Sequence, residues 1–149
     1  MVNKMNENLE LLMYIYKTCD MGVYSTNSLI NNLKSRDNKI TYLLENEVKK
    51  YEHFLNISKK LLTDCEITPK GSSIMTKMSS DMGIRMETMK DNSDAAIASM
   101  MCEGIMMGVV EMQNKIGKYK RVSDKKTIKL ANQVLKFQEQ EIEKLKTFI

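Results

Sequence analysis

Five methionines in the stretch SSIMTKMSSDMGIRMETMK have the type and spacing to bind a soft metal ion or an apolar partner. They follow one another at intervals of three or four residues, so a helix would place all five thioethers on one face. Thioether sulfur is a ligand for Cu(I), and flexible methionine side chains adapt to varied apolar partners. The candidate ligand-binding residues on this face are Met75, Met78, Met82, Met86 and Met89.

Two interpretations of this methionine face stay open. In the simpler one, the helix closes the hydrophobic core and the methionines are core residues. In the other, they line an exposed groove that binds an apolar helix, a peptide, a small ligand or a soft metal. Copper carriers combine methionine with histidine or cysteine in a tight cluster, whereas Cys65, Cys102 and His53 are scattered along the chain. An apolar partner is therefore favoured over copper.

One glutamate interrupts the apolar segment AAIASMMCEGIMMGVV. A carboxylate in such surroundings must be paired, protonated or at the margin of the apolar stripe. Its spacing from Met101 and Ile105 places Glu103 beside the main seam, where we expect it to reach a lysine such as Lys17. Glu103 is also a candidate ligand-binding residue if the methionine face is functional.

The sequence lacks the residues that common catalytic and metal centres require. A di-iron or di-manganese centre in a helical bundle needs two glutamates and two Glu-x-x-His motifs. The only histidine is His53, and Lys50 stands three residues before it. No phosphate-binding glycine loop or nucleophile elbow is present. We therefore expect no catalytic residue, no metal centre, no cofactor and no enzyme activity.

Composition favours a soluble helical protein. The 149 residues suit one domain, 1–149, and contain 42% hydrophobic and 28% charged residues with one proline. The formal charge of +4 is spread along the chain, so no nucleic-acid partner is expected. The longest apolar stretch, 95–110, is shorter than the roughly 20 residues that span a bilayer, which predicts a helix buried in protein and no membrane association. Unpaired cysteines and the absence of a secretory leader predict a cytoplasmic location.

Apolar periodicity predicts four long helices and one short helix. Asp37 is predicted to cap the second helix, and Ser72 or Ser73 the short methionine helix. Short loops predict two antiparallel hairpins joined by a long crossover, which is the layout of ferritin-like proteins. We predict an all-α, ferritin-like four-helix bundle with a short methionine-rich helix in the crossover. The predicted helices span residues 6–33, 37–64, 72–90, 94–118 and 123–149.

Two further patterns predict local packing. Gly104 and Gly108 form a G-x-x-x-G face, which predicts close approach of a neighbouring helix. In the last helix the apolar stripe includes Gln138, and one or two of the polar residues Gln138, Glu139 and Glu141 are predicted to lie partly inward. Most of these acids are predicted to face water and to pair with Lys136, Lys144 or Lys146.

The tail ANQVLKFQEQEIEKLKTFI is similar to the last helix of a widespread ferritin-like family of unknown function, in which Gln-x-x-Glu-Ile precedes a terminal hydrophobic pair. The matching residues are Gln138, Glu141 and Ile142. That family carries a His-His pair before the preceding helix, where this chain has Asn92 and Ser93, so its metal-binding signature is missing. The segments CDMGV, TMKDNS and EGIMMG resemble uncharacterised helical proteins of low-GC Gram-positive bacteria. The resemblance implies the fold and a bacterial source, and it implies no activity.

Together these features favour a protein that works by protein–protein association. We expect a homodimer formed through an exposed apolar face. The alternative is a protein that binds a soft metal, a small apolar ligand or a peptide through the methionine face and Glu103.

Overall fold

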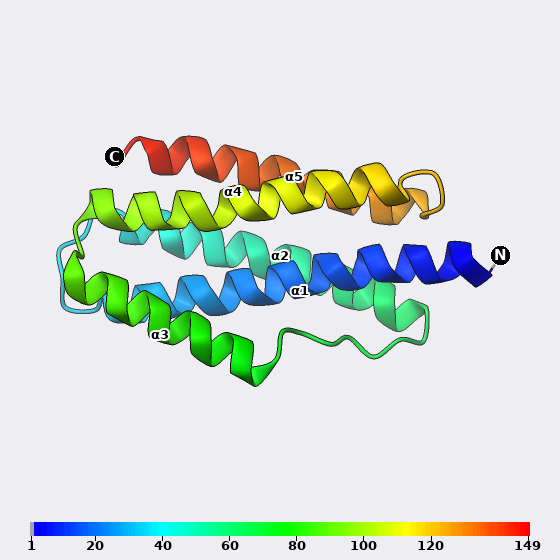
Figure 1. Cartoon of the computed structure of the whole chain (residues 1–149), viewed down its shortest axis with the longest axis horizontal. Coiled ribbons are helices and arrows are strands. Elements are labelled where there is room, and N and C mark those ends of the chain that lie inside the picture. The colour runs from blue at the N-terminus through cyan, green and yellow to red at the C-terminus, as the bar shows by residue number, and fades with distance from the viewer. Residues whose placement is uncertain (1) are drawn as a thin grey trace.

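The chain folds entirely into α-helices. The structure is a computed structural model that describes residues 2–149, with side chains from residue 7 onward. No strand is present in this described part, so the prediction of an all-α protein is confirmed (Figure 1). The helices are α1 (Val2–Asn32), α2 (Thr41–Asp64), α3 (Ile74–Lys90), α4 (Asp94–Tyr119) and α5 (Lys125–Lys146).

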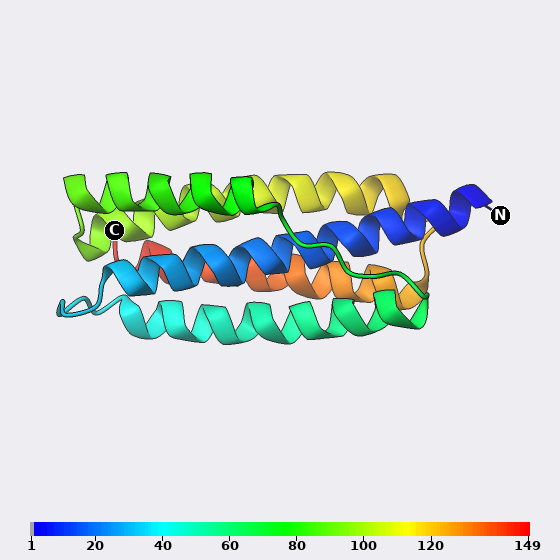
Figure 2. The same ribbon diagram turned by 90° about the horizontal axis from the view of Figure 1, so that it is seen from below.

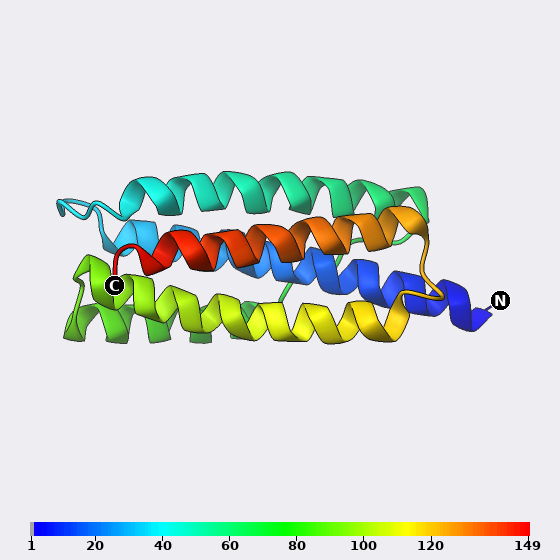
Figure 3. The same cartoon turned by 90° about the horizontal axis from the view of Figure 1, so that it is seen from above.

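Four of the helices form two hairpins that pack against each other. The first hairpin pairs α1 with α2, and the second pairs α4 with α5, both antiparallel (Figure 3). Helix α1 also contacts α4 and α5. Helix α3 packs on the outside of α1. Figure 2 shows α3 and α4 on one side of α1 and α2 on the opposite side.

The hydrophobic core consists of two clusters, each built from α1, α2, α4 and α5. None of their fully buried residues comes from α3, which contributes only the partly buried Ile84. The core therefore does not depend on the methionine helix. Central residues are Leu12, Ile15, Phe54, Met112 and Val134 in the first cluster, and Leu29, Leu44, Ile97, Ile105 and Leu145 in the second.

One of the two predicted helix caps is confirmed. Ser73 Oγ accepts a hydrogen bond of 3.1 Å from the backbone N–H of Thr76. A further cap lies at Ser93, whose Oγ accepts a hydrogen bond of 3.2 Å from the backbone N–H of Ala96. The predicted cap at Asp37 is wrong, because α2 begins at Thr41. The loop before α2 is instead held by Asp94, whose carboxylate accepts hydrogen bonds from the Asn38 side chain and the Lys39 backbone.

Helix α4 is less buried than its sequence predicts. Among the described residues it is the one helix that is long and apolar enough to cross a bilayer by length and composition, a criterion that core helices of soluble proteins also meet. Only 28% of its most apolar 18-residue window is buried. The prediction that this stretch is a helix buried in protein is therefore wrong for its outer side. The reason is that α4 has its main neighbours, α5 and α1, on one side only.

Close helix contacts lie at one glycine of the predicted pair and at one glycine outside it. A Cβ on Gly104 would meet no atom within 4 Å, whereas one on Gly108 would lie 3.2 Å from Gln138 Nε2. The G-x-x-x-G prediction thus holds for Gly108 and is wrong for Gly104. The tightest approach in the two hairpins is between α1 and α2, where a Cβ on Gly22 would lie 2.7 Å from the Tyr51 ring.

Replacing Gly22 by alanine should destabilise the fold by roughly 1–3 kcal/mol, because the new methyl group collides with a buried aromatic ring. Urea unfolding followed by circular dichroism measures the effect. Gly117→Ala is the matched control, since Gly117 lies in α4 with nothing within 4 Å of a Cβ. The control should raise stability by up to about 1 kcal/mol through helix propensity. Equal effects of the two substitutions would contradict the packing assignment.

Candidate functional site

Helix α3 turns its polar side toward the rest of the molecule. Asp20 of α1 accepts a hydrogen bond of 3.0 Å from the Ser72 backbone and forms an ion pair of 3.0 Å with Lys77. Ser25 and Ser80 share a hydrogen bond of 3.1 Å between their hydroxyl groups. Helices usually bury an apolar stripe, so this contact is the reverse of the ordinary arrangement.

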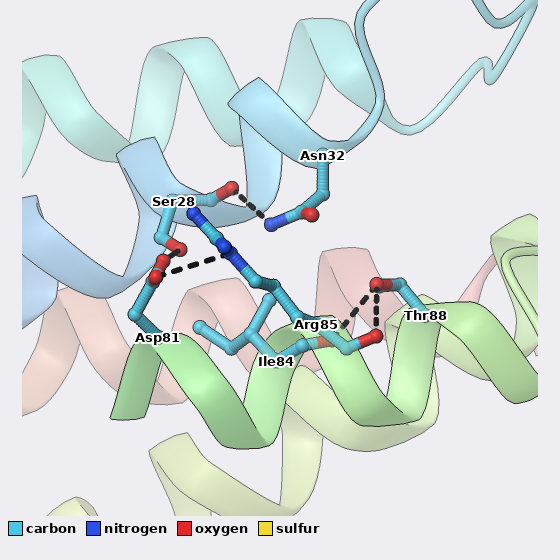
Figure 4. Close-up of polar contacts among 6 residues, drawn as sticks. All are labelled: Ser28, Asn32, Asp81, Ile84, Arg85 and Thr88. Atoms are coloured by element: carbon cyan, nitrogen blue, oxygen red, sulfur yellow. Dashed lines mark hydrogen bonds and ion pairs between the residues drawn. The ribbon is translucent and has the colours of Figure 1, made fainter. Parts of the chain in front are cut away.

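The polar contact continues toward the end of α3 (Figure 4). The Ser28 hydroxyl of α1 donates to Asp81, whose other oxygen pairs with Arg85 Nε at 3.2 Å. Thr88, the one buried residue of α3, donates its hydroxyl to the carbonyl of Ile84 in the same helix at 2.8 Å. Lys77, Ser80 and Asp81 thus each have a partner on α1, and these contacts fix the rotation of the helix about its own axis.

The methionine face therefore points into solvent. The interpretation of these methionines as core residues is wrong, because α3 presents its polar side to α1. The five thioethers lie on one helical face, as their spacing predicts. The exposed fractions are 78% for Met75, 63% for Met78, 64% for Met82, 56% for Met86 and 85% for Met89.

A second exposed apolar area lies on the outer side of α4. It includes Met106, Met107 and Val110, which are half to three-quarters exposed and line a shallow hollow. Nine of the eleven exposed large hydrophobic residues of the described chain belong to α3 or α4. We call these nine residues the apolar surface: Ile74, Met75, Met78, Met82, Met86, Met89, Met106, Met107 and Val110.

Glu103 lies on the outer side of α4, at the edge of the shallow hollow. It is exposed, and none of the ion pairs among the described residues involves it, so the expected contact with Lys17 is not formed. Helix α3 packs on α1 rather than on α4. Glu103 and the methionine face therefore belong to two separate helices, α4 and α3, which both lie on one side of α1 (Figure 2).

Two carboxyl groups meet inside the two hairpins. Glu47 of α2 is 1% exposed and Glu141 of α5 is 3% exposed. Glu47 Oε2 accepts a hydrogen bond of 3.1 Å from Thr26, and Glu141 Oε1 pairs with Lys144 at 3.3 Å. The second oxygen of each, Oε1 of Glu47 and Oε2 of Glu141, has no donor among the described residues. An isolated buried charge costs several kcal/mol, so the pair needs a compensating proton or cation.

A shared proton satisfies both free oxygens. Burial, together with the charge of Glu141, raises the pKa of Glu47 from 4.5 to about 8. Burial also raises the pKa of Glu141, although Lys144 and a hydrogen bond with Glu47 hold it down. Glu47 is therefore protonated at neutral pH and donates to Glu141. The pair carries one negative charge, which Lys144 faces from the surface.

Two more polar groups complete this buried layer. Gln138 Nε2 donates to the Tyr51 hydroxyl at 3.4 Å, and burial raises the pKa of Tyr51 well above its ordinary value. The inward position of Gln138 is as predicted. Glu141 pairs with Lys144 as predicted, and with Gln138 it makes up the inward polar groups expected in this segment, although both are buried rather than partly inward.

The buried layer offers few metal ligands. Among the described residues no three histidine, cysteine, aspartate or glutamate side chains are placed to hold a metal ion. His53 lies exposed on α2 beside the ring of Phe54, with 5.5 Å between the ring centroids. Cys19 is buried, Cys65 is exposed and Cys102 is half-buried, and all three are free thiols.

Glu47 was not singled out from the sequence, although a signal was present. It lies three residues after Leu44 and four before Tyr51, both of which are buried. This spacing places it on the inward stripe of a helix. The neighbouring Val48 fits a heptad equally well, and a carboxylate is rarely fully buried, so composition alone favours Val48 as the inward residue.

Comparison of the chain with family models, with curated proteins and with solved structures finds no match in any of the three. The resemblance of the tail to a ferritin-like family stays a prediction.

Because Glu47 shares a proton with Glu141, we expect the stability of the wild type to depend on pH. The substitution Glu47→Gln should remove this dependence. Because the folded-state pKa of Glu47 is raised, the folded protein holds a proton that the unfolded chain releases between about pH 4.5 and 8. As the pH rises through this range, the free energy of unfolding of the wild type should fall relative to that of the variant, by at most about 1.4 kcal/mol per pH unit. Urea unfolding at a series of pH values measures the difference.

The control for this experiment is Glu45→Gln, which neutralises an exposed glutamate on the same helix. Its profile should run parallel to that of the wild type. Parallel profiles for wild type and Glu47→Gln would rule out the shared proton.

Proposed function

We propose that this protein works by protein–protein association, as a homodimer formed through the apolar surface of α3 and α4. In this proposal the two hairpins are a ferritin-like four-helix bundle without a di-iron centre. They act as a rigid cytoplasmic scaffold that carries α3 and has no catalytic role. The single observation that carries the proposal is the reversed orientation of α3, whose polar side contacts α1 while five methionines face water.

The size of the apolar surface supports association. Soluble monomers expose large apolar residues singly, whereas contiguous apolar areas mark interaction sites. Burying one methionine, isoleucine or valine side chain gains about 1.5–3 kcal/mol. Association also has a cost in lost freedom of motion, so only the surplus of apolar burial over that cost stabilises a complex. Six of the nine residues lie on α3, so a contact through this helix alone buries most of the apolar surface.

Charged substitutions on the methionine face should prevent association. Met82→Lys combined with Met86→Lys places two ammonium groups where an apolar contact is required, and light scattering should report a monomer. The wild type should show about twice the monomer mass. The double variant should fold normally, because both side chains are more than half exposed.

The matched control adds the same charge elsewhere. Asn46→Lys with Asn56→Lys changes two exposed residues of α2, on the opposite side of α1 from α3. It should keep the wild-type mass. A wild type that stays a strict monomer at high concentration would remove the basis of the proposal.

Soft-metal binding is the second candidate function. The observation that favours it is that all five thioethers are accessible on one helical face. Thioethers bind Cu(I) and Ag(I), and the expected site would use Met78, Met82 and Met86. Glu103 lies on another helix and would not join this site.

Replacing Met78, Met82 and Met86 together by leucine separates the two functions. Leucine keeps the apolar character and removes the sulfur ligands, so the dimer should persist while Ag(I) binding, measured by calorimetry, is lost. Equal Ag(I) binding by wild type and variant would exclude the methionine site. Loss of dimerisation in this variant would show that association depends on the shape of methionine rather than on apolar burial.

A further inference from the structure

The spacing of the exposed methionines reads the same in both directions. From Met75 to Met89 the steps are three, four, four and three residues, with Met82 at the centre. The average step of 3.5 residues is the period of a coiled-coil seam. An isologous interface requires that residue i meets residue j while j meets i. A face that is symmetric about its central residue fulfils this condition for two antiparallel helices.

We propose that α3 pairs antiparallel with α3 of a second copy, about a twofold axis that passes beside Met82. This inference rests on the proposed function and specifies its partner and geometry. In this register Met82 faces Met82 of the second copy, Met78 faces its Met86, and Met75 faces its Met89. Every exposed methionine of α3 then lies opposite another methionine. Flexible thioethers pack well in such a contact because they adapt their rotamers to each other.

The charges beside the methionine face fit the same register. Asp81 and Arg85 lie along the edge of the face that borders α1, on the side adjacent to Met78. The Asp81 carboxylate also accepts the hydrogen bond from Ser28, and its side chain is 27% exposed. A twofold axis beside Met82 brings equivalent edges of the two helices together. Arg85 of one copy then lies within about 3 Å, along the helix axis, of Asp81 of the other.

Arg85 can pair with Asp81 of its own copy and with Asp81 of the second copy at the same time. Its Nε pairs with Asp81 of its own copy at 3.2 Å, and its side chain is 67% exposed. A guanidinium group has five N–H donors, so the terminal nitrogens stay available to a second carboxylate. The symmetric arrangement therefore forms two equivalent Arg–Asp pairs across the interface. A parallel arrangement of the two helices does not bring these two residues to the same edge.

Helix α3 is accessible for this contact. It lies outside the two hairpins (Figure 2). Its polar side contacts α1, and its methionine side is exposed. Two helices in close contact have axes about 8–10 Å apart, which brings facing Cα atoms to disulfide range. Cysteine substitution therefore tests which residues face each other.

The experiment uses the full-length protein with Cys65→Ser and Cys102→Ser, which leaves only the buried Cys19. Met82→Cys is then added, and disulfide formation with diamide is followed on non-reducing gels. Met82→Cys should form a covalent dimer at least ten times faster than Asn46→Cys, which reports random collisions. Met75→Cys and Met89→Cys should each remain monomeric alone, because the two copies of either residue lie about 21 Å apart. Together in one chain they should cross-link.

Three outcomes would overturn the pairing, and they separate it from the proposed function. Cross-linking of Met75→Cys alone would mean that the helices run parallel. Fast cross-linking of Met106→Cys with none at Met82→Cys would mean that the copies associate through α4, which leaves the proposed function in place. If no variant cross-links and light scattering gives a monomer, both the pairing and the proposed association are wrong.

Discussion

The hydrogen-bonded contact between α1 and α3 determines what this protein presents to its surroundings. Asp20, Ser25 and Ser28 form a polar stripe on α1, and α3 satisfies it with Lys77, Ser80 and Asp81. A buried polar group without a partner costs free energy, so α3 must turn this side inward. The methionines on its other side are then exposed, and the apolar surface follows from that rotation.

The two hairpins carry this arrangement without help from α3. Their clusters draw residues from α1, α2, α4 and α5, and α3 adds only a partly buried isoleucine. A helix that contributes so little to the core is held in its position by polar contacts with α1 and by the short connection of residues 91–93 to α4. Such a helix suits an interaction role, because changes on its outer face leave the core intact.

The buried carboxyl pair is a separate constraint on the same scaffold. Glu47 and Glu141 lie between the two hydrophobic clusters. Each has one oxygen without another donor, and one proton shared by these two oxygens satisfies both. A carboxylic acid and a carboxylate in contact fix the relative position of α2 and α5 more narrowly than apolar contacts do, since hydrogen bonds are directional. The polar layer with Tyr51 and Gln138 therefore contributes to the register of the two hairpins.

The sequence by itself determined the helices, one of their caps and the single methionine face. Helical periodicity and capping are local properties, so Ser73 and the spacing from Met75 to Met89 could be interpreted without the fold. Only the tertiary structure decided that this face is exposed, that Glu47 is buried and that Gly22 lies against a neighbouring helix while Gly104 does not. The physical reason is that an amphipathic helix can turn either side to a neighbour. The choice depends on whether the neighbouring surface is apolar or, as on α1, a row of hydrogen-bonding groups.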